Sequence, residues 1–274
     1  MSQLNVDDIF PFSVGVQSVN ANGVYIDGED STSSMKMTST GNPVIGINNT
    51  YIGWQAGVSL TLAGASNTFF GKQAGASVTG GVNNVLLGSS AGPSITTGFS
   101  NVMIGAGAGG ATTGNNNVFI GHITGQTTTT GTNNIILGYQ SFASTATTSD
   151  SITLGNSNHN VLRCAVTSIT SLSDARDKKD VEDLNVGLDF IDGLRPVKFV
   201  WDDRNEEGKH DIADFGFIAQ DLKAAEEEVE MADVLKLVYD ENPEKLEASY
   251  GKLIPILVKA VQELAAKVKQ LENK

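Results

Sequence analysis

A short motif recurs about every 17 residues between Asn49 and Gly155. Each copy has a polar residue, three mostly apolar β-formers and a glycine, and the glycines stand 18, 17, 17, 16, 17 and 17 residues apart. The seven copies are Asn49–Gly53, Asn67–Gly71, Asn84–Gly88, Asn101–Gly105, Asn117–Gly121, Asn134–Gly138 and Ser151–Gly155. A period this regular predicts stacked coils, because each coil can bury its apolar side only with the help of its neighbours.

The residue types of the motif predict what each coil contains. The apolar residues, such as Phe69 and Phe70 in the second copy, favour one short strand, and the glycine allows a turn where a Cβ would clash. The recurring asparagines can form a hydrogen-bonded ladder along the stack. Because a coil this small has only a thin apolar strip, we expect three chains to pack their strips around a common axis. The spacing leaves open whether coils close within one chain or interleave between chains.

These repeats resemble the head repeats of trimeric autotransporter adhesins of the YadA type, which form β-rolls, and they are similar to repeats in many phage fibre proteins. The resemblance covers about residues 45–156. It implies a trimeric shaft built from β-strands.

Composition changes near residues 165–173. Three basic and six acidic residues precede Ser173, for a net charge of −3, whereas the remainder has 15 basic and 25 acidic residues, for a net charge of −10. The first part also holds 25 of the 30 glycines. We therefore predict four segments, namely an N-terminal attachment segment (1–44), a β-repeat shaft (45–165), a linker (166–172) and a C-terminal domain (173–274).

Several functions are disfavoured by what the sequence lacks. An acidic chain of pI about 4.6 has no basic stripe for nucleic acid. We expect no membrane insertion, because no apolar run reaches the ~18 residues that span a bilayer, and the acidic N-terminus does not resemble a signal peptide. His122, His159 and His210 lack metal-ligand spacing, so we expect neither metal nor cofactor. The single cysteine, Cys164, excludes an intrachain disulfide and is interpreted as a small buried apolar residue.

The composition break coincides with a hexapeptide, Ser-Asp-Ala-Arg-Asp-Lys, that begins at Ser173. A serine hydroxyl becomes a nucleophile when a neighbouring base takes its proton, and a neutral lysine can be that base. The alternative is a serine that caps a helix ahead of mixed charges. Arg176 could lower the proton affinity of Lys178 or could pair with Asp174 or Asp177, and we favour the pairing.

The sequence that follows the hexapeptide distinguishes a nucleophilic serine from a serine that only caps a helix. The hexapeptide, Gly193–Trp201, Gly216–Gln220, Tyr250 and the run Leu253–Leu264 occur in the same order as in the intramolecular chaperone of endosialidase tailspikes. The chain resembles that family from Ser173 to its end. The resemblance implies an α+β chaperone that trimerises a β-rich stalk and then cleaves itself, with Ser173 as nucleophile and Lys178 as base. It thus implies a self-processing serine endopeptidase that acts once in cis.

Ring geometry predicts which bond is cut. Attack of the Ser173 hydroxyl on the Leu172 carbonyl forms a five-membered ring, whereas attack on its own carbonyl would need a strained four-membered ring. We therefore expect cleavage between Leu172 and Ser173, by an N-to-O shift and hydrolysis of the resulting ester.

The end of the chain predicts a coiled-coil helix. Apolar residues spaced 3, 4, 3, 4 and 3 apart are typical of an a/d seam. They are Ile254, Leu257, Val261, Leu264, Val268 and Leu271. The pattern does not specify three strands, so the expected trimer depends on the resemblance and on the shaft.

The predicted fold class is a mainly β repeat shaft (β-roll or solenoid, trimeric) followed by an α+β chaperone domain that ends in a coiled-coil helix. The predicted function is a homotrimeric tail fibre or spike subunit of a virion, assembled in the host cytoplasm. Its expected partners are phage tail or baseplate proteins and a host cell-surface glycan or protein. The alternative is a purely structural connector or decoration fibre. A capsule-degrading enzyme is disfavoured, because it needs paired carboxylates and no Asp or Glu lies between Asp30 and Asp150.

Overall fold

The computed structural model describes residues 19–20, 23–27, 34–37, 48–159, 161–165, 170–202 and 210–273. The chain divides into two compact units, Met1–Asn156 and Ser157–Lys274. The expected attachment segment, residues 1–44, lies outside the described residues except for three short strands. These are β1 (Val19–Asn20), β2 (Gly23–Asp27) and β3 (Ser34–Met37), which pair antiparallel in chain order.

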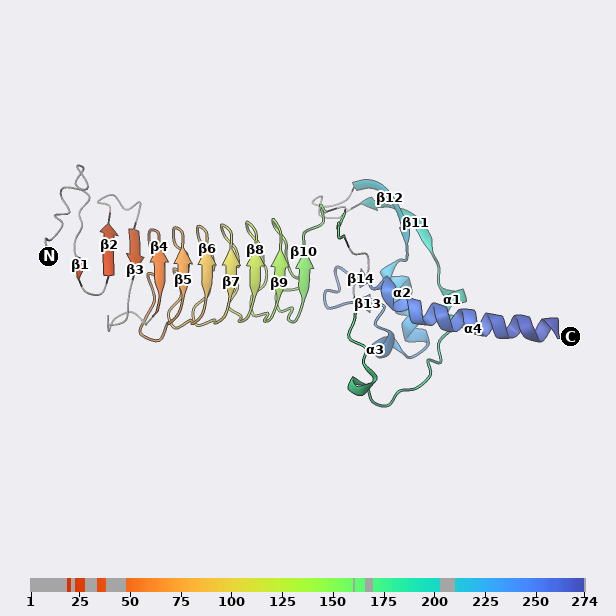
Figure 1. Ribbon diagram of the computed structural model, residues 1–274. Coiled ribbons are helices and arrows are strands. Elements are labelled where there is room, and N and C mark those ends of the chain that lie inside the picture. Colours follow the sequence, from red (N-terminus) through yellow and green to blue (C-terminus); the bar gives the residue numbers. More distant parts are fainter. Residues whose placement is uncertain are drawn as a thin grey trace. The chain divides into compact units, whose positions relative to one another are not determined.

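The repeats form a parallel β-solenoid, in which the seven strands from β4 to β10 stand side by side (Figure 1). Each strand pairs in register with the strand one coil further on, for example Met103 with Phe119. The coils therefore close within one chain, which decides between the two arrangements that the spacing left open. The strands are β4 (Thr50–Ile52), β5 (Thr68–Phe70), β6 (Val85–Leu87), β7 (Val102–Ile104), β8 (Val118–Ile120), β9 (Ile135–Leu137) and β10 (Ile152–Leu154).

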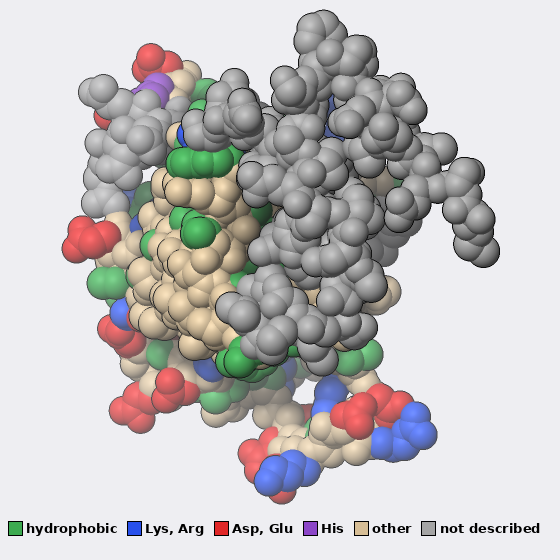
Figure 2. Space-filling view, turned by 90° about the vertical axis from the view of Figure 1, so that its left-hand side faces the viewer, with side chains coloured by type: hydrophobic (Ala, Val, Ile, Leu, Met, Phe, Trp, Pro, Cys, Tyr) green, Lys and Arg blue, Asp and Glu red, His purple; other side chains and the backbone are tan. Residues whose placement is uncertain are grey.

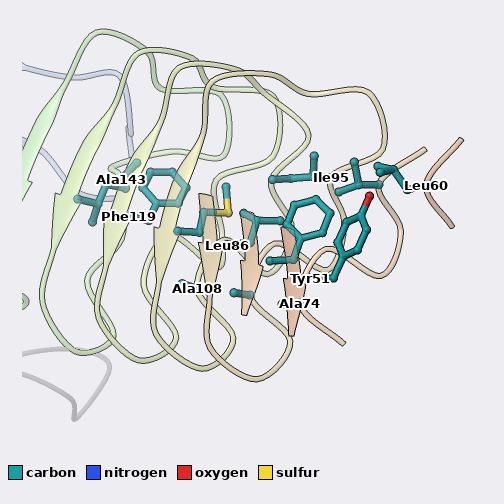
Figure 3. Packing of buried hydrophobic residues seen from close by; sticks show 13 residues of the cluster. Tyr51, Leu60, Ala74, Leu86, Ile95, Ala108, Phe119 and Ala143 are labelled. Atoms are coloured by element: carbon teal, nitrogen blue, oxygen red, sulfur yellow. The ribbon is translucent and has the colours of Figure 1, made fainter. Parts of the chain in front are cut away.

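The core of the solenoid is a single file of side chains inside the coils (Figure 3). Only the middle residue of each strand points inward, as in β6, where Leu86 is buried between the exposed Val85 and Leu87. The opposite limb contributes small residues such as Ala74 and Ala108. A large side chain from the strand meets small ones from the opposite limb, and the first three coils also bury Leu60, Val78 and Ile95.

The recurring glycine has a steric cause. Gly71 and Gly88 each have a φ of +137°, and a Cβ on either would lie 2.5–2.6 Å from the carbonyl oxygen of the corresponding glycine in the next coil. The coils thus approach each other too closely at this corner for any side chain, and the backbone conformation is one that only glycine adopts readily.

The expected asparagine ladder is confirmed. The Oδ1 atom of Asn67 accepts hydrogen bonds from the backbone N–H and the side-chain amide of Asn84, at 3.0 and 3.1 Å. The amide of Asn84 also donates to the carbonyl oxygen of Gly98 at 2.8 Å. The backbone N–H bonds repeat as far as Asn134, the bonds between side-chain amides repeat as far as Asn117, and all six asparagines are buried. Buried polar groups of the backbone corner are thereby satisfied in every coil.

The surface of the solenoid is mostly uncharged. Figure 2 views the stack of coils end on, and much of the described surface at its centre is tan, the colour of backbone and uncharged polar side chains. This agrees with a sequence that has no Asp or Glu between Asp30 and Asp150.

The second unit is a small α/β domain that ends in a long helix, as the sequence predicts. Two hairpin-like pairs, β11 with β12 and β13 with β14, are antiparallel. The elements are η2 (Ala175–Asp177), α1 (Leu188–Gly193), β11 (Val197–Asp202), β12 (His210–Gly216), α2 (Ala219–Glu228), α3 (Ala232–Leu235), β13 (Val238–Tyr239), β14 (Glu247–Ala248), η3 (Tyr250–Lys252) and α4 (Leu253–Glu272). No helix in the described part of the chain combines the length and apolar character of a membrane span.

Helix α4 organises this unit. Its buried side chains, Leu253, Ile256 and Ala260, face a core that includes Phe190 of α1. The Glu263 carboxylate accepts a hydrogen bond from the backbone N–H of Leu188 at 2.8 Å, which satisfies one free donor at the start of α1. Pro255 is tolerated because it stands in the first turn, where backbone N–H groups have no helical partner.

The interpretation of Cys164 as a buried residue is wrong. Cys164 is a free and exposed thiol. It belongs to a stretch, residues 161–165, whose side chains are all exposed. Its apolar neighbours Val161 and Leu162 are also well exposed, at 63% and 72%.

Candidate functional site

Ser173 lies directly before a single turn of 3-10 helix, η2. Asp174 caps this turn, because its carboxylate accepts a hydrogen bond from the Arg176 backbone N–H at 2.9 Å. Lys178 ends the turn in an extended conformation, and its N–H donates to the Ala175 carbonyl at 3.2 Å. The turn therefore brings residues 173 and 178 back toward each other across five positions.

A bidentate ion pair stiffens the same turn. The Arg176 guanidinium donates to both carboxylate oxygens of Asp174, at 3.0 and 2.6 Å. This pair, together with the backbone bond from Arg176, lowers the pKa of Asp174, and the Asp174 carboxylate in turn raises the pKa of Arg176. Arg176 is thus a partner of Asp174, as favoured from the sequence, and its charge is matched locally.

The turn places the two predicted site residues in contact. The Lys178 Nζ atom lies 2.6 Å from the Ser173 Oγ atom, within the distance at which a base can take a proton from a nucleophile. Every residue from Ser171 to Asp180 is exposed in the single chain. An exposed lysine amine is ordinarily protonated at neutral pH, so a base of this kind needs a less solvated environment to act.

The bond on the N-terminal side of Ser173 is open to attack and to water. The Leu172 side chain is completely exposed, and the Ser171 hydroxyl donates to the Leu172 carbonyl oxygen at 3.3 Å. A donor on that oxygen would stabilise negative charge that develops there during attack on the carbonyl carbon. Ser171 could not be recognised from the sequence, since a serine in a serine- and threonine-rich stretch carries no signal.

The other motifs of the C-terminal unit build its frame. Gly193–Trp201 covers the end of α1 and most of β11, and Gly216–Gln220 joins β12 to α2. The Tyr250 hydroxyl accepts from the Phe217 N–H at 3.1 Å and donates to its carbonyl oxygen at 3.3 Å. A Cβ on Gly216 would lie 2.7 Å from that hydroxyl, so the glycine leaves room for the tyrosine.

The described part of the C-terminal unit also has an apolar pocket. A pocket of about 520 Å³ is lined mainly by apolar groups of Pro196, Val197, Phe215, Phe217 and Tyr250. Across the described ranges, no three His, Cys, Asp or Glu side chains are grouped so as to hold a metal ion.

The aromatic residues of the shaft have mixed environments. Trp54 lies under the Lys72 ammonium at 5.2 Å, Tyr139 stacks on His122 with ring centroids 5.6 Å apart, and Phe99 is 42% exposed. None of the three belongs to the buried core of the solenoid.

These features define a class of protein, a β-solenoid followed by an α/β unit that opens with an exposed serine and lysine in contact. Residues 173–232 match the family model described as chaperone of endosialidase, which is classed as a peptidase family. The match begins at Ser173 and supports a chaperone domain in the C-terminal unit, with the self-cleaving activity that the family implies. Searches among curated proteins and among solved structures each gave no match.

Proposed function

We propose that this chain is a trimeric tail-fibre-type subunit of a virion, assembled by a C-terminal intramolecular chaperone that then cuts itself off. The observation that carries the proposal is the family match, which starts at Ser173, C-terminal to the β-solenoid in the chain. The shaft would attach to phage tail or baseplate proteins and present its surface to a host glycan or protein. A connector without a receptor is the alternative, and binding of fluorescent trimers to host cells would separate the two.

The contact between Lys178 and Ser173 supports a specific cleavage reaction. The neutral Lys178 amine takes the proton of the Ser173 hydroxyl, and the Oγ atom bonds to the Leu172 carbonyl carbon. The bond from that carbon to the Ser173 nitrogen then breaks, and the nitrogen receives the proton from Lys178. Water hydrolyses the ester, which leaves a carboxylate on Leu172 and a free hydroxyl and amine on Ser173. No cofactor or metal takes part in this scheme.

The exposure of the pair supports a cut that waits for assembly. In the single chain both side chains are exposed to solvent. Copies of the chain that pack around the turn would remove water from it, and desolvation favours the neutral amine. Cleavage would then follow trimer formation instead of competing with it.

An exposed apolar seam on α4 supports the oligomer. The six residues of the predicted a/d seam lie on one helix and all are exposed, from Leu257 and Val268 at 44% to Leu271 at 69%. The buried residues of α4 lie on a different side, so the helix can keep its place in the unit and still meet other copies. Three copies that pack their seams together would bury apolar surface that a single chain exposes to water, and this burial stabilises the oligomer.

The test is the intact mass of purified protein. We expect the parent chain to yield a fragment that begins at Ser173, and Ser173→Ala to remain uncut. Lys178→Arg should also remain uncut, because a guanidinium keeps the positive charge but does not give up its proton. Lys179→Arg is the matched control at the neighbouring lysine and should be cut normally. A parent chain that stays at full length as a monomer, or a Lys178→Arg protein that is cut, would contradict the proposal.

A further inference from the structure

The strands of the solenoid have a second apolar side that the single chain does not use. The first and third residues of β4 to β10 point outward and form two rows, which we call the outer sheet face. The first-residue row is Thr50, Thr68, Val85, Val102, Val118, Ile135 and Ile152. The third-residue row is Ile52, Phe70, Leu87, Ile104, Ile120, Leu137 and Leu154. Several of these side chains are well exposed, for example Leu87 and Ile120 at 40% and Leu154 at 54%.

The core of each coil does not need this face. The middle residue of every strand from β4 to β9 is buried in the coil interior, together with small residues of the opposite limb. Twelve of the fourteen outer positions are nevertheless apolar, and none is charged. An exposed apolar face of this length is unusual for a single folded chain and marks a surface that another molecule covers.

The period of the face identifies what covers it. Adjacent strands of a sheet lie about 4.8 Å apart, so the outer side chains repeat at that spacing over all seven coils. Only a partner with the same spacing can match a side chain at every coil, and parallel copies of this shaft have it. The rows also differ in shape, because the first is mainly β-branched valine and isoleucine and the third carries larger leucine and phenylalanine.

We propose that the outer sheet face is the trimer interface of the shaft, with the first-residue row of one copy packed against the third-residue row of the next. This inference rests on the proposed trimer and adds where its axis lies. Contacts between two different rows are head-to-tail contacts, and three of them can close a ring. The ring would have an uncharged centre, so no like charges would oppose each other.

Cysteine cross-linking tests the pairing of the rows. Cys164 is exposed and is first replaced by serine, so that added thiols are the only ones. Val118→Cys and Ile120→Cys place one thiol in each row of β8. Treated with a short bismaleimide, the double variant should give covalent trimers on a denaturing gel. Each single variant should give dimers at most, because one thiol per chain can join only two chains.

A charge placed on the face gives an independent readout. Ile120→Lys should lose the trimer mass in light scattering, since a buried unpaired ammonium is costly. The control is Thr127→Lys, which adds the same charge at an exposed position of the same coil and should remain trimeric. Circular dichroism confirms that both variants keep their strands.

The outcomes separate this interface from the proposed function. Suppose that the parent is trimeric and self-cleaved, that Ile120→Lys stays trimeric, and that the double-cysteine variant gives no covalent trimer. These results would overturn the proposed interface and leave the proposed function intact. A double-cysteine variant that yields covalent dimers only would also overturn it. Covalent trimers from the double variant alone, together with loss of the trimer in Ile120→Lys, would establish it.

Discussion

The buried asparagines show how much of the shaft depends on single residues. From Asn49 to Asn101, each Oδ1 accepts two hydrogen bonds from the asparagine of the next coil, and each amide donates to a carbonyl oxygen of the limb that closes the coil. Asn101, for example, donates to Asn84 and Gly114 and accepts from Asn117. One amide thus satisfies both donors and acceptors that would otherwise be buried without partners.

We expect Asn101→Asp to destabilise the shaft by about 3 kcal/mol, because the carboxylate loses both amide donors and faces two acceptor oxygens. Thermal unfolding followed by circular dichroism measures the difference. Asn116→Asp is the control, since Asn116 is exposed and Asp150 occupies the equivalent position of a later coil. Equal unfolding midpoints for both variants would show that the ladder does not contribute to stability.

At single residues, the sequence predicted contacts better than it predicted burial. The pair of Ser173 and Lys178 was implied by the family resemblance, and the two side chains do lie in contact. The exposure of Cys164 could not be predicted, since its apolar neighbours offer no periodic pattern. The role of Glu263 carried no signal either, because its partner, the Leu188 N–H, is 75 residues away in sequence.

At the level of elements, regular periods made the prediction possible. The 17-residue period gave the strands of the solenoid, and the 3–4 spacing gave α4. The period did not divide the apolar triplets into an inner and an outer set, because Leu86 and Leu87 are alike in the sequence and opposite in the structure. The short strands β11 to β14 have no repeat, and their pairing depends on contacts between distant residues.

Helix α4 has two apolar sides, one buried in its own unit and one exposed. Leu253, Ile256 and Ala260 hold the helix in its unit, whereas the exposed seam from Ile254 to Leu271 has no role in a single chain. A change in the seam should therefore affect association without unfolding the unit.

We expect Leu264→Lys to lower the fraction of trimer during expression and to slow self-cleavage at least ten-fold, because a charge in an apolar seam opposes helix association. Cleaved and uncut chains are quantified by mass spectrometry over time. Gln262→Lys adds the same charge at an exposed position two residues away and is the matched control. If both variants are cut at the parent rate, the seam does not assemble the chaperone.

At the scale of the whole molecule, the repeats would make assembly of the proposed trimer difficult. Coils with nearly identical outer residues allow three chains to associate one coil out of register, and incomplete solenoids expose strand edges that favour aggregation. A C-terminal domain that gathers three chains raises their effective concentration before the shafts pair. The same domain is unnecessary once every coil has found its neighbours.

Removal of the chaperone should make the assembly irreversible in practice. Chains released by heating could no longer find one another efficiently, so persistence of the shaft would depend on its unfolding rate and not on an equilibrium. The relevant comparison is therefore between cut and uncut trimers with identical shafts. We expect cleaved trimers to keep their trimer band in detergent at temperatures that dissociate Ser173→Ala trimers, as seen on gels of boiled and unboiled samples. Protease removal of residues 173–274 from the Ser173→Ala trimer should restore the resistance, which distinguishes loss of the chaperone from an effect of the substitution. Equal resistance of cut and uncut trimers would mean that the cut serves another purpose than kinetic stability.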